Sequence, residues 1–112
     1  MTSIADCLPA FASEIAEALG QGKRGDLAAQ LVKAQIAEIT YDESVDAGYI
    51  YLTPPIAPLS AVHNEAAKVR ETIPFAAPHW FNVDVDHEGF AFGVELLGRK
   101  EIILALRDGT VV

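Results

Sequence analysis

Cysteine is almost absent from this sequence: Cys7 stands alone, so no disulfide can form within the chain. This composition favours a reducing compartment, and the cytoplasm is the expected location. No apolar run approaches the ~20 residues that a membrane-spanning helix needs. The N-terminal stretch has no basic segment ahead of its apolar pattern, so a secretory signal peptide is not expected.

Basic residues are also scarce. The chain has 8 lysines and arginines against 16 aspartates and glutamates, for a net charge of −8. Residues 1–40 contain five acids and three bases, whereas residues 41–112 contain eleven and five. No basic cluster exceeds a pair, and an acidic surface repels nucleic acid and anionic membranes. A basic protein partner is favoured instead, and no cofactor is indicated.

The overall composition is that of a globular protein, with 51% apolar and 21% charged residues. The 112 residues suffice for one domain whose core needs neither metal nor disulfide. We expect a single domain over residues 1–112, with a helical segment at 1–36 and an antiparallel sheet at 37–112.

The first residues have the 3.6-residue period of an amphipathic helix. Apolar side chains recur at Ile4, Leu8, Phe11, Ile15 and Leu19. The spacing predicts a helix over residues 3–19, with Thr2 or Ser3 as N-cap, unless Pro9 sets its true start. A second helix is expected over residues 27–36.

From about residue 36 the apolar pattern alternates with a period of two, which indicates strands. The pattern predicts a hairpin at 36–53, a partly exposed strand at 68–75 and a second hairpin at 80–97, with a strand or short helix at 102–106. These elements define an α+β fold, in which two N-terminal helices pack on a small, mostly antiparallel sheet built from two hairpins. Open sheet edges invite pairing between chains, so we expect a homodimer.

DVDHEGFAFGVE, residues 84–95, nearly matches the calcium-loop pattern D-x-[DN]-x-[DN]-G-x5-E. Its flanks alternate like strands, whereas an EF-hand needs a helix on each side. One apolar face is kept if Val83 lies opposite Phe92 and Phe81 opposite Val94.

This register sets Glu95 opposite Trp80, about 13 Å along the strand from Asp84, which is too far to share one ion. We therefore predict no metal site, although Asp84, Asp86 and Glu88 alone could contact a cation. The favoured interpretation is an acidic turn in which Asp86 caps its own backbone.

A tyrosine–aspartate pair, a second aspartate, a tyrosine-bearing strand and an aspartate-rich turn ending in glycine recur along residues 39–97. These motifs resemble the YuzE-like domain, a small domain of unknown function. The matching residues are Tyr41, Asp42, Asp46, Tyr49, Asp84, Asp86, Gly89 and Glu95. Gly48 departs from the family pattern, which has a bulky apolar residue there. The resemblance implies a small antiparallel sheet and suggests an antitoxin-like or partner-binding role.

The aspartates of the two hairpins allow two interpretations. They are Asp42, Asp46, Asp84 and Asp86. They could form a shared cluster for metal binding or acid–base chemistry, or each could close its own turn. The second interpretation is favoured, because no histidine or cysteine joins them at ligand spacing.

The expected function is that of a non-enzymatic interaction module, homo-oligomeric and binding a basic protein partner. Trp80 and Asn82 alternate away from the expected core and are the candidate interface residues. The alternative is a small metal-dependent or acid–base enzyme that uses the turn carboxylates. No catalytic residue is assigned.

Overall fold

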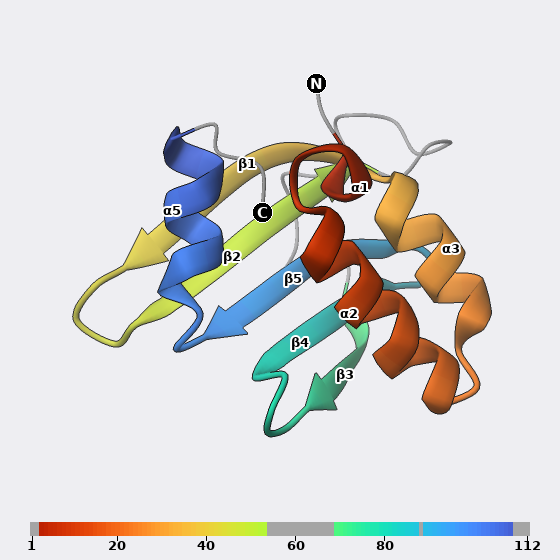
Figure 1. The fold of residues 1–112 in the computed structure, drawn as a ribbon. Helices are drawn as coiled ribbons and strands as arrows, with labels where there is room; N and C mark the ends of the chain where they lie inside the picture. Colours follow the sequence, from red (N-terminus) through yellow and green to blue (C-terminus); the bar gives the residue numbers. More distant parts are fainter. Residues whose placement is uncertain (1–2, 54–68, 88, 109–112) are drawn as a thin grey trace.

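The computed structural model describes residues 3–53, 69–87 and 89–108 of the chain. Its helices are α1 (Ile4–Cys7), α2 (Pro9–Gln21), α3 (Gly25–Lys33) and α5 (Lys100–Asp108). Its strands are β1 (Gln35–Asp42), β2 (Ala47–Thr53), β3 (Val69–Phe75), β4 (Phe81–Asp86) and β5 (Ala91–Leu97). The strands form one antiparallel sheet in the order β1-β2-β5-β4-β3 (Figure 1).

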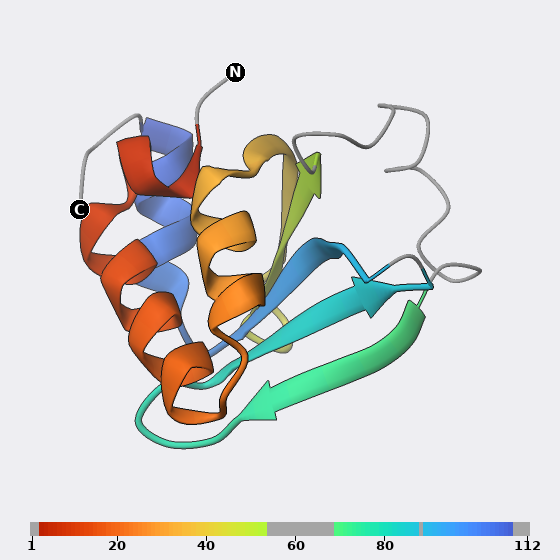
Figure 2. The same cartoon turned by 90° about the vertical axis from the view of Figure 1, so that its right-hand side faces the viewer.

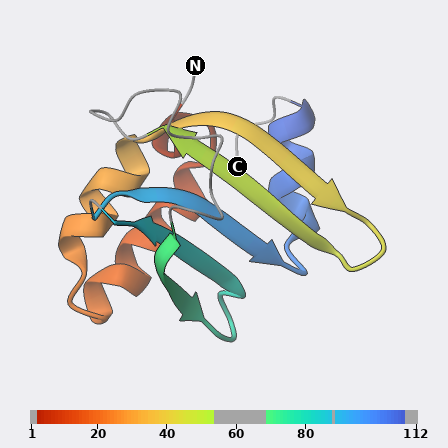
Figure 3. The ribbon, with the colours of Figure 1, turned by 180° about the vertical axis from the view of Figure 1, so that it is seen from behind.

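These helices all lie against one face of the sheet, so the fold has two layers (Figure 2). Strand residues that alternate toward the helices are buried, as in β2, where buried and partly exposed positions alternate throughout. The largest fully buried side chains are Ile4, Leu8, Ile15, Leu19, Leu27, Leu31, Ile50, Leu52, Phe81, Leu96, Ile102 and Ile103. Among the described helices, none covers the opposite face, here called the outer face (Figure 3).

The expected α+β class with an antiparallel sheet is confirmed, and the strand expected at 68–75 is present as β3. The arrangement of two hairpins and two N-terminal helices is wrong. Because β3 pairs with β4, the sheet has five strands; three of the described helices precede it in the chain and another helix, α5, follows it. The sequence of residues 102–106, IILAL, is compatible with a strand or a helix because five consecutive apolar residues show neither period. The helix buries Ile102 and Ile103 but leaves Leu104 40% exposed, which is the pattern of one helical face.

The predicted first helix is divided. Ser3 caps α1 by accepting a hydrogen bond from the backbone N–H of Asp6 at 3.2 Å. The chain then turns at Leu8, and α2 begins at Pro9, whose missing N–H is tolerated in a first turn. The second helix ends at Lys33 rather than at residue 36, because Gln35 already belongs to β1.

A β-bulge changes the expected pairing of β4 with β5. Val83 lies opposite Val94 and Phe81 lies opposite Leu96, so the predicted register is wrong. Because Asp84 pairs with Gly93 while Val85 pairs with Ala91, β5 holds one extra residue at this point, which shifts the register. An apolar alternation in sequence does not reveal such an insertion.

As a result Glu95 lies opposite Asn82, not opposite Trp80. Glu95 is then two residues from the partner of Asp84, or about 7 Å along the strand direction. The 13 Å separation expected between the two carboxylates is therefore also wrong. The flanking strands still exclude the helix–loop–helix frame of an EF-hand.

Close packing of α5 requires the glycine at position 48. A Cβ on Gly48 would lie 2.7 Å from Cδ1 of Ile103 and 3.2 Å from the carbonyl oxygen of Thr40. Ile103 thus fills the space above β2 that a larger side chain at position 48 would occupy. A bulky apolar residue at position 48 would therefore collide with α5.

We predict that Gly48→Val lowers the free energy of unfolding by about 1–3 kcal/mol, because the added methyl groups overpack the contact with Ile103. Urea unfolding measures the change. Gly20→Ala is the matched control, because an added Cβ there meets nothing within 4 Å, and it should gain up to ~1 kcal/mol. The double variant Gly48→Val with Ile103→Ala should lose less stability than the sum of the two single losses, because the two side chains compete for one space. An unchanged urea midpoint for Gly48→Val would contradict the packing argument.

Candidate functional site

The residues of the YuzE-like pattern separate into groups on different parts of the sheet. At the β1–β2 turn, the hydroxyl of Tyr41 donates to Oδ1 of Asp46 at 2.6 Å. This hydrogen bond to the carboxylate raises the pKa of Tyr41 to about 12. Asp42 accepts from the hydroxyl of Ser44 at 2.6 Å and from its backbone N–H at 2.9 Å, and these bonds lower the pKa of Asp42.

On the outer face, Asp84 is held between two neighbouring hydroxyl groups. Tyr49 donates to Oδ2 of Asp84 and Thr72 donates to Oδ1, both at 2.6 Å. The ring of Tyr49 crosses β5 over Gly93, where any Cβ would collide with it. Asp84 therefore joins β2, β3 and β4 and does not close a turn of its own, contrary to the favoured interpretation.

The other two outer-face positions of the pattern also have polar partners. Nδ2 of Asn82 donates to Oε1 of Glu95 at 2.8 Å, which ties β4 to β5. Asp86 is 7% exposed and accepts the backbone N–H of Phe90 at 2.9 Å, so it caps its own turn as expected. Gly89 has a φ of 88°, the left-handed conformation that such a turn needs.

The described carboxylates do not form a common centre. Asp42 on β1 lies opposite Ala47 on β2. Asp84 on β4 lies opposite Gly93 on β5, and Gly93 in turn lies opposite Tyr51, four residues along β2 from Ala47. Asp42 and Asp84 are thus separated by about 13 Å along the strands and by three strand spacings across the sheet. Within the described residues, no three histidine, cysteine or acidic side chains could hold a metal ion together. Glu88 lies outside the described residues.

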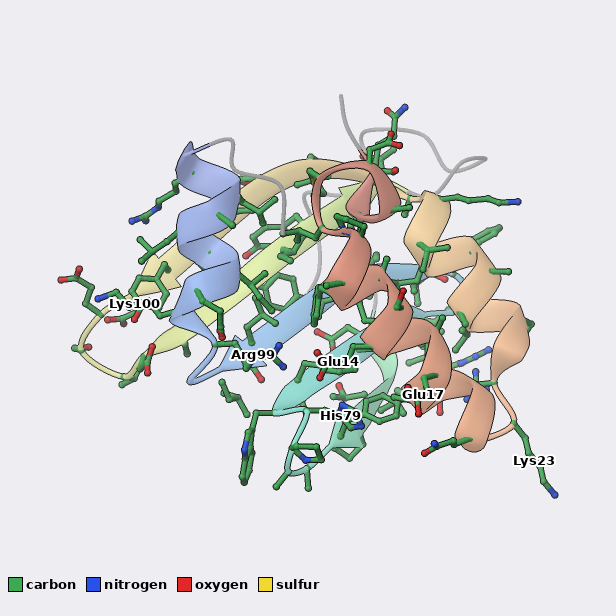
Figure 4. The ribbon with its side chains drawn as sticks, in the orientation of Figure 1. Glu14, Glu17, Lys23, His79, Arg99 and Lys100 are labelled. Atoms are coloured by element: carbon green, nitrogen blue, oxygen red, sulfur yellow. The ribbon has the colours of Figure 1, made fainter. Side chains whose placement is uncertain are left out.

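A second polar cluster, which the sequence analysis missed, joins α2 to the end of the sheet. It consists of Glu14, His79 and Arg99 (Figure 4). Nη2 of Arg99 lies 3.0 Å from Oε1 of Glu14, and Nη1 lies 3.1 Å from Oε2. Nδ1 of His79 lies 2.8 Å from the same Oε2. We call this cluster the clamp.

The clamp is partly buried and rests on aromatic rings. The exposed side-chain fractions are 24% for Glu14, 26% for His79 and 19% for Arg99. The guanidinium of Arg99 lies 5.6 Å from the ring centre of Phe11, and His79 packs edge-on against Phe81. Its members come from distant parts of the chain, so no local motif could have revealed it.

The charges of the clamp shift the ionisation of its members. Burial raises the pKa of Glu14, but the hydrogen bonds and charges of Arg99 and His79 outweigh it and leave the pKa below its usual value. The hydrogen bond from Arg99 to Glu14 raises the pKa of Arg99. Both shifts favour the charged pair at neutral pH.

Next to the clamp, apolar side chains are exposed at one end of the sheet. Val45, Trp80 and Leu97 are 67%, 49% and 38% exposed. The backbone N–H of Leu97 donates to the carbonyl of Trp80, and that of Gly98 donates to the carbonyl of Asp46, both at 2.9 Å. These bonds place the β1–β2 turn, the end of β5 and the start of β4 together (Figure 1). We call Val45, Trp80 and Leu97 the Trp80 surface.

The fold and its polar clusters define an α+β protein with one helix-covered face. Comparison of the chain with protein-family models, curated proteins and solved structures finds no match. The resemblance of residues 39–97 to the YuzE-like domain stays a prediction. In the part of the chain that the structure describes, every helix is too short or too polar to cross a membrane.

We predict that Glu14→Gln lowers the free energy of unfolding by about 1–3 kcal/mol at neutral pH, because the neutral amide keeps only one acceptor oxygen and its hydrogen bond to Arg99 is no longer between two charged groups. The pKa of Glu14 is lower in the folded protein than in the unfolded chain, so its stabilising effect is present above the unfolded-state pKa and is lost as the pH falls through the folded-state pKa. Chemical unfolding at pH 7 and at pH 3 should show a smaller difference between the natural protein and the variant at pH 3.

Glu17→Gln is the control on the same helix, because Glu17 is exposed and its carboxylate accepts a hydrogen bond from the exposed side chain of Gln21 at 3.4 Å. It should change the free energy of unfolding by less than ~0.5 kcal/mol at neutral pH. A difference for Glu14→Gln that grows at acidic pH would contradict the assigned ionisation.

Proposed function

We propose that this chain is a non-enzymatic interaction module that binds a basic segment of a partner protein at the Trp80 surface. The observation that carries the proposal is the exposure of Trp80. Trp80 is half-exposed, and backbone hydrogen bonds join its segment to the segments of Val45 and Leu97, which are also exposed. Exposed apolar side chains that gather on one part of a surface mark interaction sites. Tryptophan is also the residue type most enriched among the energetic centres of protein interfaces.

The backbone at Trp80 supports the same proposal. Its φ of 53° lies in the left-handed region, which a bulky non-glycine residue rarely adopts. Such a conformation costs roughly 1–3 kcal/mol and is found mainly where function requires it.

Charge determines the kind of partner. Asp42, Glu43 and Asp46 are exposed at the β1–β2 turn beside Val45. Arg99 contacts the carboxylates of Glu14 and Glu101, so much of its charge is already compensated. Although Lys100 follows it, the acids outnumber the bases here, as they do in the whole chain. A segment with lysines or arginines around an apolar anchor would complement this surface.

The other expectations remain predictions. A homodimer through the sheet edges is not favoured, because β1 and β3 each contain an irregularity in pairing and β3 also contains Pro74. Bulges and prolines are devices that hinder pairing between sheet edges. The enzyme alternative gains no support from the separated aspartates. An antitoxin-like role would be one form of the proposed partner binding.

Panning a random-peptide display library against the immobilised protein tests the proposal. Enriched peptides should combine lysine or arginine with at least one large apolar residue. Trp80→Ser should weaken binding of a selected peptide at least ~30-fold, the effect of removing an interface residue that contributes 2 kcal/mol. Binding should also weaken as salt rises, because exposed charges are screened.

Leu104→Ser is the matched control, since Leu104 is similarly exposed but lies on α5. It should leave peptide affinity unchanged. Enrichment of acidic peptides, or equal binding by the natural protein and Trp80→Ser, would overturn the proposal. Sedimentation of the protein alone tests whether a second copy of the chain binds at the Trp80 surface. A dimer that dissociates on Trp80→Ser would show that this surface binds a second copy, and it would overturn the proposal of a basic partner.

A further inference from the structure

We infer that Glu14, His79 and Arg99 are positioning residues that hold Trp80 in its exposed, left-handed conformation. The inference rests on the proposed function, because the clamp would act on binding only through Trp80. It assigns a role to three residues, which lie on α2, in the β3–β4 turn and in the segment just before α5.

The backbone dihedral angles at Trp80 are set by the two peptide groups that flank its Cα. The preceding group is held because the carbonyl oxygen of His79 accepts from Nη1 of Arg99 at 2.6 Å. The following group is held because the carbonyl oxygen of Trp80 accepts from the N–H of Leu97 at 2.9 Å. Hydrogen bonds on both peptide groups thus restrain Trp80 to its left-handed conformation, in which φ is 53°.

Arg99 is itself fixed from several sides. Two nitrogens of the Arg99 guanidinium donate to the carboxylate of Glu14, and the guanidinium lies over the ring of Phe11. Glu14 also hydrogen-bonds the imidazole of His79. The carboxylate of Glu14 therefore orients both Arg99, which donates to the carbonyl oxygen of His79, and His79 itself. Only the planar fork of arginine meets a carboxylate through two nitrogens while reaching a third acceptor, and lysine lacks this geometry.

A positioned Trp80 would raise affinity without adding contacts. If loosening the clamp left Trp80 in its binding conformation about a tenth of the time, the apparent dissociation constant would rise about tenfold. Most of this change in affinity would come from greater disorder of Trp80 in the free protein, and that disorder can be measured directly.

The test uses the fluorescence of Trp80, the only tryptophan in the chain. Arg99→Lys keeps the positive charge and removes the fork, so we expect lower fluorescence anisotropy, greater quenching by acrylamide and about tenfold weaker binding of the selected peptide. Arg24→Lys is the matched control, since Arg24 also forms an ion pair between distant elements, at 3.2 Å to Glu71. It should leave all three measurements unchanged.

His79→Asn is a second variant, because it retains a side-chain donor for Glu14 and should lie between Arg99→Lys and the natural protein. Circular dichroism checks that each variant is folded. Unchanged anisotropy and quenching in Arg99→Lys would overturn the inference, even if peptides bind at the Trp80 surface. Conversely, a loosened Trp80 in a protein that binds no peptide would support the clamp and refute the proposed function.

Discussion

Burial of a single face of the five-stranded sheet is the constraint on which the other features depend. Strands expose alternate side chains to opposite faces, so helices on one side oblige each strand to keep its apolar residues on that side. Glycine at position 48 and the docking of Ile103 follow from the need to seat α5 there. The outer face can then carry polar groups, and Tyr49, Asp84 and Glu95 occupy it as hydrogen-bonded links between strands.

The clamp restrains the β3–β4 turn at the end of the sheet. Strand ends leave turns that hydrogen bonds within the sheet do not restrain, and exposed turns are usually mobile. Here α2 and the segment before α5 both contribute charged side chains that contact the β3–β4 turn. The helix layer therefore restrains the position of an exposed aromatic residue as well as covering the core.

Local regularities were readable from the sequence, whereas contacts between distant residues were not. Alternation around Ile50 and Val83 predicted strands, and Ser3 and Pro9 marked helix starts, because each signal lies within a few residues. The register at Glu95 was misplaced because one inserted residue in β5 is invisible to a period-two pattern. The pairing of Glu14 with Arg99 depends on the tertiary fold, and the backbone conformation of Trp80 has no signature in residue type.

The contact between Gly48 and Ile103 makes two distant positions interdependent. Because they share one volume, a chain with this sheet that enlarges the residue at 48 must reduce or displace the one at 103. The sizes of the residues at positions 48 and 103, taken together, thus indicate from sequence whether a C-terminal helix can lie over β2.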